Sequence, residues 1–293
     1  MRVETASVER LIDFPLKAGE SPVWDARAQA LYFADLDAPA LFRFDPATRA
    51  VARWDMPSGI GSFGLCADGR AIVALRTGVH LFDFATRRLE FLVHPEPDLP
   101  DTRLNDGKVG PDGRFWVGTM HERTPREPVA SLYRIDWDGT STRMLGGLRI
   151  SNGLAWSPDG RTLWHSDSRS HVLRCFDYDP ATGAISNGRD VHRFALEDGL
   201  PDGAAMDAEG RYWSCGVTAG CLNRFGPDGT LDLKLELPIL CPSMPCFGGP
   251  DLRTLYITSL TRARDGVEGI GTLSSLQLDV PGAPVGRFRE RMG

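Results

Sequence analysis

The sequence predicts an all-β protein, a six-bladed β-propeller with a central channel, and three observations support this. Short acidic-Gly turns recur along the chain between strand-like apolar runs. A further apolar run follows each of these units, and six units of roughly forty to fifty residues account for all 293 residues. No stretch shows the apolar period of about 3.6 residues that indicates amphipathic helices.

The turns come in chain order and define six copies of the unit. Four are Asp68-Gly69, Asp112-Gly113, Asp159-Gly160 and Glu209-Gly210, and such pairs suit hairpins because Gly accepts positive φ. Two degenerate copies are residues 22–34, with Asp25-Ala26-Arg27 at the turn, and residues 246–259, with Pro250-Asp251-Leu252. The outer strand-like runs are residues 41–45, 79–83, 131–136, 172–177, 221–225 and 272–278. We expect residues 8–14 to close the ring by adding a strand to the last sheet.

The alternative to a propeller is a pair of β-sandwiches. Sandwich strands do not normally repeat their turn chemistry at such a spacing. The repeat therefore favours a single β-propeller domain over residues 1–293.

Composition and charge argue against several classes of partner. The formal net charge is −6 and the pI is about 5.6, and the longest basic cluster, Arg87-Arg88, is too short to bind a nucleic-acid backbone. The first ten residues carry four charges and no apolar run, so we expect no signal peptide, no membrane partner and a cytoplasmic location. The six cysteines form no Cys-x-x-Cys pair, which predicts reduced core thiols and argues against a thiolate zinc site.

Two short motifs look functional, but the sequence around them argues against the function. Residues 59–64 match Gly-x-Gly-x-x-Gly, yet no strand precedes them and residues 65–75 form strand, turn and strand instead of a helix. Ser62 lacks the first glycine of a nucleophile elbow, because Ile60 occupies that position.

One position can be compared around the predicted ring: the residue seven before each turn acid, at the entry to the innermost strand. It is occupied in turn by Glu20, Gly61, Asn105, Asn152, Asp202 and Met244; in the first unit, which lacks the Asp-Gly turn, Glu20 is placed by aligning Trp24 with Trp156. Two carboxylates facing one narrow channel repel unless a cation lies between them. Glu20, Asn152 and Asp202 offer only oxygen ligands, which suits Ca²⁺, Mg²⁺ or Mn²⁺ and leaves Zn²⁺ and Fe²⁺ open. The alternative is that these side chains only line a water-filled channel.

An ordered set of motifs then carries a family resemblance. The motifs are Gly19-Glu20-Ser21-Pro22-Val23-Trp24, Arg103-Leu104-Asn105-Asp106-Gly107-Lys108, Gly118-Thr119-Met120, Ile150-Ser151-Asn152-Gly153-Leu154, Pro201-Asp202-Gly203 and Cys246-Phe247-Gly248-Gly249. Together, from about residue 16 to residue 260, they resemble the regucalcin and gluconolactonase (senescence marker protein) family of sugar lactone hydrolases.

The resemblance implies a six-bladed propeller and assigns roles at the ring. It implies that Glu20, Asn152 and Asp202 hold one divalent cation, that Asp202 is also the catalytic acid and base, and that Arg103 and Asn105 contact substrate. The loop after Met120 departs from the family pattern, since Arg123 stands where vertebrate regucalcins have a glutamate and Glu122 is offset by one. Residues 260–264 are also less regular than the usual continuation. We expect Asp106 and Lys108 to belong to turn and strand packing.

The predicted activity is divalent-metal-dependent hydrolysis of an aldonic lactone, such as glucono-, xylono- or arabinonolactone, to the sugar acid in sugar catabolism. A cation at the carbonyl oxygen stabilises the tetrahedral oxyanion. The attacking water could lie on the cation or be held by Asp202, which would pass a proton to the leaving ring oxygen. Loop 121–129 is expected to help select the sugar.

Two other functions stay open at this point, a non-catalytic calcium-binding regulator and a hydrolase of organophosphates or aryl esters. The expected oligomeric state is a monomer or small homo-oligomer.

Overall fold

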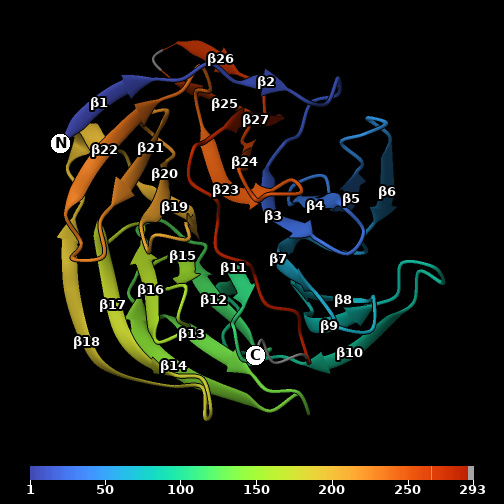
Figure 1. Ribbon diagram of the computed structural model, residues 1–293. Coiled ribbons are helices and arrows are strands. Elements are labelled where there is room, and N and C mark those ends of the chain that lie inside the picture. Colours follow the sequence, from blue (N-terminus) through green and yellow to red (C-terminus); the bar gives the residue numbers. More distant parts are fainter. Residues whose placement is uncertain (265, 290–293) are drawn as a thin grey trace.

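The computed structural model describes residues 1–264 and 266–289, and it confirms the six-bladed propeller. Six antiparallel sheets, here called blades 1 to 6, surround a central channel (Figure 1). A 3-10 turn, Leu196–Asp198, is the one helical element among the described residues. The third strand of every blade overlaps the outer run that the repeat predicts.

The first four blades have their strands in sequence order from the channel outward. Blade 1 comprises β3 (Gly19–Asp25), β4 (Ala30–Asp35), β5 (Ala40–Phe44) and β6 (Val51–Asp55). Blade 2 comprises β7 (Ile60–Leu65), β8 (Ala71–Leu75), β9 (Gly78–Phe82) and β10 (Leu89–Val93). Blade 3 comprises β11 (Thr102–Val109), β12 (Phe115–His121), β13 (Ala130–Ile135) and β14 (Ser141–Leu148). Blade 4 comprises β15 (Ser151–Trp156), β16 (Thr162–Asp167), β17 (Val172–Asp179) and β18 (Ala184–Arg193).

The last two blades take up strands from the start of the chain. Blade 5 comprises β19 (Pro201–Met206), β20 (Tyr212–Gly216), β21 (Cys221–Phe225) and β22 (Leu231–Glu236), followed by β1 (Arg2–Thr5). Blade 6 comprises β23 (Pro242–Gly248), β24 (Thr254–Ser259) and β27 (Leu273–Gln277), followed by β2 (Glu9–Arg10). A separate hairpin, β25 (Arg262–Arg264) and β26 (Val267–Gly269), interrupts blade 6.

The pairing of β2 with β27 closes the ring and confirms the role predicted for residues 8–14. Arg49, in the β5–β6 turn of blade 1, binds the Glu9 carboxylate at 2.7 Å and the carbonyls of Arg10 and Leu11 at 3.1 Å each. The β2–β27 ladder therefore completes blade 6, and the contacts of Arg49 join that strand to blade 1. The parallel pairing of β1 with β22 is an addition that the repeat did not predict.

The hydrophobic core is divided into six clusters, one between each pair of neighbouring blades. Trp116 of β12 and Leu154 of β15, for example, pack together between blades 3 and 4. All six cysteines are buried, in line with the predicted core thiols. Because apolar burial lies between the sheets, the axis is left to polar side chains.

A β-bulge interrupts the first hairpin of every blade close to the entry of its innermost strand. In β15, Asn152 pairs with Ser166 and Ala155 with Trp164, so two residues oppose one. Blades 1, 3 and 5 have the same two-against-one arrangement, whereas in blades 2 and 6 one residue lies unpaired with none opposite. Bulges re-aim side chains, and the two-against-one form is found in the four blades that have a polar residue at the compared position.

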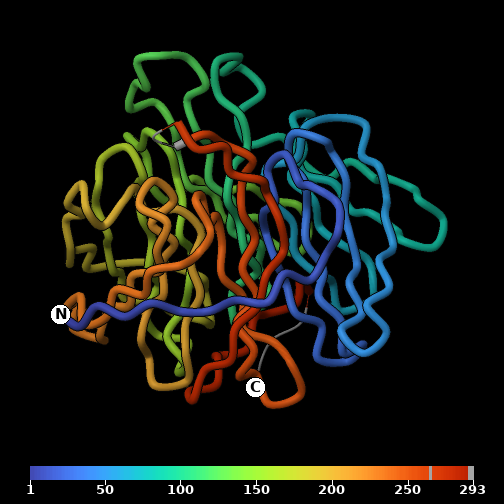
Figure 2. Tube along the Cα trace, turned by 90° about the horizontal axis from the view of Figure 1, so that it is seen from above, coloured from blue at the N-terminus to red at the C-terminus, as the bar shows by residue number. Residues whose placement is uncertain are grey.

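The two ends of the channel differ. The innermost strands begin at one end, here the ring end, and finish at the acidic-Gly turns of the other end, here the turn end. Residues 281–289 lie across the turn end (Figure 1), where the backbone of Phe288 bonds Leu65 and Ala67, and Arg289 donates to the Gly113 carbonyl. The C-terminal segment thus covers the turn end, and loop 121–129 and the β25–β26 hairpin project from the opposite end (Figure 2).

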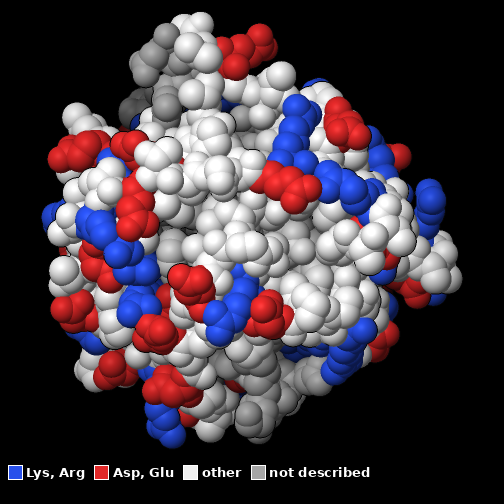
Figure 3. All heavy atoms as spheres, turned by 45° about the horizontal axis from the view of Figure 1, so that its top comes forward, with Lys and Arg blue, Asp and Glu red and all other residues white. Residues whose placement is uncertain are grey.

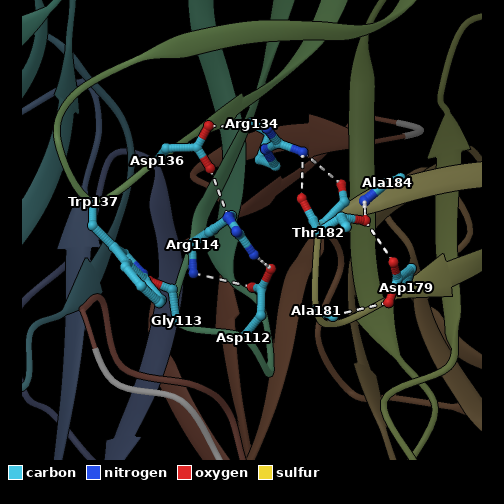
Figure 4. Close-up of polar contacts among 11 residues, drawn as sticks. Asp112, Gly113, Arg114, Arg134, Asp136, Trp137, Asp179, Ala181, Thr182 and Ala184 are labelled. Carbon is cyan, nitrogen blue, oxygen red and sulfur yellow. Dashed lines mark hydrogen bonds and ion pairs between the residues drawn. The ribbon is translucent and has the colours of Figure 1, made fainter.

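An ion-pair network at the turn end fastens blade 3 to blade 4 (Figure 4). Arg114 binds Asp112 at 2.5 Å and Asp136 at 2.6 Å. Arg134 binds Asp136 at 2.9 Å and donates to the Thr182 and Gly183 carbonyls of the β17–β18 turn. Because it lies away from the ring end and joins blade 3 to the β17–β18 turn, we assign the network to blade packing.

Acidic and basic side chains are interspersed on the face shown in Figure 3, without an extended basic field. Within residues 1–264 and 266–289, no helix is long and apolar enough to cross a bilayer.

Candidate active site

The structure brings the predicted polar positions together at the ring end of the channel. Glu20, Asn105, Asn152 and Asp202 lie near the starts of β3, β11, β15 and β19, which contact one another around the axis. The first three side chains are at most 8% exposed, and Asp202 is partly exposed. Gly61 occupies the same position in β7, where an added Cβ would meet the Leu104 backbone. The innermost strands therefore approach too closely for a side chain in that blade.

Glu20 is held by an unusual backbone. Ser21, which follows it in the bulge, has φ of 50°, and its N–H donates to Glu20 Oε2 at 2.9 Å. A non-glycine residue at positive φ is uncommon and costs free energy. The bulge therefore fixes the direction of the Glu20 carboxylate at a cost in local backbone strain.

Asn152 is positioned by the equivalent bulge of β15. Its Nδ2 donates to Ser168 Oγ at 2.8 Å, and Gly153 after it has φ of 63°. A Cβ at Gly153 would collide with the Tyr212 hydroxyl, which itself donates to the Gly153 carbonyl at 2.7 Å. Glycine is therefore required there by both conformation and space.

Two buried charged residues of β11, Asp106 and Lys108, belong to the site and were not predicted to do so. Lys108 Nζ donates to the Ala204 carbonyl at 2.5 Å in β19, across the channel. Burial raises the pKa of Asp106, and the Lys108 charge opposes this. Burial likewise lowers the pKa of Lys108, and Asp106 opposes it. Asp106 Oδ2 also accepts the Leu154 N–H at 3.4 Å, so both residues make strand contacts as expected, and both also interact electrostatically with Glu20.

The acidic groups raise one another's pKa. Burial and then the negative charges of Asp202 and Asp106 raise the pKa of Glu20 well above its ordinary value. Burial and then Asp106 raise the pKa of Asp202 to about 7, while a hydrogen bond from Asn152 and the charge of the exposed Arg262 oppose the rise. The site thus concentrates negative charge that the protein itself does not neutralise.

This arrangement fits a divalent cation. When ionised, the three acids Glu20, Asp106 and Asp202 carry three negative charges, and Lys108 offsets one, which leaves the charge that one divalent cation balances. Two buried oxygens beside Glu20 and Asn152, Ser21 Oγ and Asp106 Oδ1, have no hydrogen-bond partner among the described residues. Hard cations prefer such oxygen donors.

A candidate ligand set here contains an amide. No group of three or more His, Cys, Asp and Glu side chains suited to hold a metal occurs within the described parts of the chain. Glu20 and Asp202 are the two residues of these types in the proposed ligand set. The third cation ligand would therefore be the amide oxygen of Asn152.

Arg103 and Asn105 lie together on β11. Arg103 Nη1 donates to Asn105 Oδ1 at 3.1 Å, and Asn105 Nδ2 donates to the Ser151 carbonyl at 3.0 Å. Arg103 Nε also lies 3.4 Å from Glu122 Oε1. Burial lowers the pKa of Arg103, and the Glu122 charge opposes it. A guanidinium and an amide beside the ring can bind hydroxyl oxygens.

The offset glutamate of the β12–β13 loop turns toward this arginine. Glu122 also binds Arg76 through both guanidinium nitrogens, at 2.7 and 2.5 Å. Arg123, in contrast, is exposed and pairs with Asp101. The carboxylate on this side of the site is therefore that of Glu122.

The fold and this site define a six-bladed propeller of the lactonase type, and sequence comparison gives the family. The chain belongs to the SMP-30/Gluconolactonase/LRE-like family, whose profile matches residues 18–261. It is 39% identical to a 6-deoxy-6-sulfogluconolactonase of Pseudomonas putida, over 92% of this chain and 94% of that protein. It is 33% identical to regucalcin of Xenopus laevis, over 91% and 90% of the two chains.

Solved structures agree with this assignment. A calcium-binding protein, regucalcin, from Agrobacterium tumefaciens superposes with a TM-score of 0.91 at 26% identity, covering 99% of this chain and all of that one. A gluconolactonase from Xanthomonas campestris gives 0.74 at 25% identity, with coverage of 94% and 89%. Family and named lactonases together support the prediction that the chain is a hydrolase of the lactonase class.

Proposed function

We propose that this chain hydrolyses a sugar lactone to the free sugar acid, with one divalent cation held by Glu20, Asn152 and Asp202. The observation that carries the proposal is the convergence of two carboxyl groups of raised pKa and one oriented amide at one end of the channel. Relatives named as a sulfogluconolactonase and a gluconolactonase support the substrate class. The bound cation would supply Lewis-acid stabilisation of the charge that develops on the carbonyl oxygen.

Asp202 is the group best suited to move a proton. A positioned carboxylate can accept a proton from a water molecule and return it to a leaving group. We assign to it the uptake of a proton from the attacking water and its delivery to the ring oxygen that leaves. Its partial exposure gives it access to a substrate, which the deeper Asp106 lacks.

Arg103 and Asn105 are assigned to substrate binding. Their mutual hydrogen bond presents one guanidinium and one amide beside the ring, and both groups match the hydroxyls of a polyol. Glu122 keeps Arg103 in place and leaves guanidinium donors for the substrate.

The test is proton release in a weakly buffered solution over a panel of pentono- and hexonolactones. We expect acidification well above the spontaneous rate for at least one lactone, and a loss of at least about a hundredfold in kcat for Asp202→Asn. Asp228→Asn, the same change on an exposed turn, is the control. A folded, cation-binding protein that releases no protons from any lactone would instead support the calcium-binding regulator.

A further inference from the structure

Three arginines line a hollow at the ring end that the proposed function does not use. The hollow has a volume of about 530 Å³ and is lined by Thr124, Pro125, Arg126, Arg149 and Arg169. The three arginines come from three separate connections of blades 3 and 4, namely β12–β13, β14–β15 and β16–β17. Since β12, β14 and β16 all run toward the ring end, all three connections lie there, as does the β12–β13 loop that projects in Figure 2.

The guanidinium groups in this hollow are not neutralised by the protein. Arg126 donates to the His121 carbonyl and Arg149 to the Arg126 carbonyl. The Arg169 side chain makes no hydrogen bond or ion pair to any residue that the structure describes. Each guanidinium has five N–H donors, so most of the donors in the hollow are available to a ligand.

Two neighbouring acids, Glu122 and Asp167, are already engaged. Glu122 is bound by Arg76 and Arg103, and Asp167 is buried and accepts the backbone N–H groups of Arg149 and Ile150. Burial is the largest cause that lowers the pKa of Arg126, and the positive charge of Arg169 is the second. The negative charge of Glu122 acts in the opposite direction. The hollow therefore has an uncompensated positive charge in a chain whose formal net charge is −6.

Two links connect the hollow to the proposed catalytic ring. Arg169 directly follows Ser168, the residue that accepts the Asn152 amide at 2.8 Å, and one chain step is about 3.8 Å. Arg126 lies within electrostatic range of Arg103, which binds Asn105. A substrate whose lactone carbonyl lies at the ring can therefore extend toward the hollow.

We propose that Arg126, Arg149 and Arg169 form a subsite for an anionic group, a sulfonate, phosphate or carboxylate, at the end of the sugar lactone away from its carbonyl. This rests on the proposed lactonase function and defines its substrate class. Guanidinium groups bind such oxyanions by paired, charge-assisted hydrogen bonds. The subsite favours an anionic lactone over its neutral counterpart.

The experiment compares glucono-1,5-lactone with its 6-sulfonate and 6-phosphate analogues and with a lactone of a sugar diacid. Wild-type enzyme should show a higher kcat/KM for at least one anionic lactone. Arg169→Gln, which disturbs no internal contact, should raise KM for that lactone by about tenfold to a hundredfold and leave the neutral lactone unchanged. Arg169→Lys should retain part of the affinity.

Arg123→Gln is the matched control, because Arg123 is in the β12–β13 loop but outside the hollow and pairs with Asp101 at the surface. It should leave KM for every lactone unchanged. Raised ionic strength should weaken binding of the anionic lactone more than that of the neutral one.

The outcomes separate the two proposals. Equal loss for neutral and anionic lactones in Arg169→Gln, or a wild-type preference for the neutral lactone, overturns the anion subsite and leaves the lactonase intact. Absence of turnover for the whole panel overturns the lactonase itself.

Discussion

Replacing Asp202 with Asn should stabilise the cation-free protein, and increasingly so as the pH rises. The pKa of Asp202 is about 7 in the folded chain, against an ordinary value of 3.8. A group whose folded pKa is raised contributes stability that is present below its unfolded pKa and is lost as pH rises through the folded value. Each tenfold change in proton affinity is worth about 1.4 kcal/mol, so the loss attributable to Asp202 is about 4 kcal/mol.

The assay is urea unfolding of wild-type and Asp202→Asn proteins, stripped of cations, at about pH 4 and about pH 8. The stability difference between them should grow by about 4 kcal/mol in favour of the variant. Asp228→Asn should show no such growth, because hydrogen bonds within its own turn lower the pKa of Asp228. A stability difference between the two proteins that stays constant with pH would refute the reasoning that desolvation and the charge of Asp106 raise the pKa of Asp202.

Three further changes test how the site is supported. Ser168→Ala removes the group that orients Asn152 and should weaken cation binding by about tenfold; calorimetric titration measures this, and unchanged affinity would show that Ser168 does not orient the amide. Gly153→Ala places a side chain at positive φ against Tyr212 and should destabilise the protein by at least about 2 kcal/mol, measured by urea unfolding; a neutral effect would argue against the bulge geometry. Phe288→Ala removes a fully buried ring of the C-terminal segment and should cost about 3 to 5 kcal/mol; a loss below about 1 kcal/mol in the same assay would mean that this segment does not seal the turn end.

Cation affinity should depend on pH in the opposite direction. Cation binding needs ionised ligands, and the pKa of Asp202 is about 7 while that of Glu20 is also raised. Affinity should therefore increase as pH rises through about 7, with release of protons. Calorimetry in two buffers of different ionisation enthalpy measures the protons released, and an affinity independent of pH would contradict the ligand assignment.

The ring positions could be predicted because the hairpin turns fix the register of each innermost strand. Counting back seven residues from the turn acids gives Asn105, Asn152 and Asp202, aligning Trp24 with Trp156 adds Glu20, and the structure brings all four to one end of the channel. The closing strand was also predictable, because the stretch 8–14 contains several apolar residues and precedes the first repeat.

Other features have no signal in a single sequence. Asp106 lies inside the two-against-one bulge of β11, where strand alternation cannot be counted, so the direction of its side chain was not predictable. The parallel strand β1 is not connected to its partner β22 by a hairpin turn, so the repeat of turns does not predict it. Arg126, Arg149 and Arg169 come from three loops whose shapes depend on contacts between them.

The most direct test of the central claim is a titration of chelator-stripped enzyme with a single divalent cation while proton release from a lactone substrate is recorded. The proposed site predicts no activity without cation, a linear rise to a maximum at one cation per chain, and no rise at the same cation concentration for Asp202→Asn. Full activity of wild-type enzyme in the presence of chelator, with metal analysis showing no bound cation, would contradict the assignment of Glu20, Asn152 and Asp202 as a catalytic cation site.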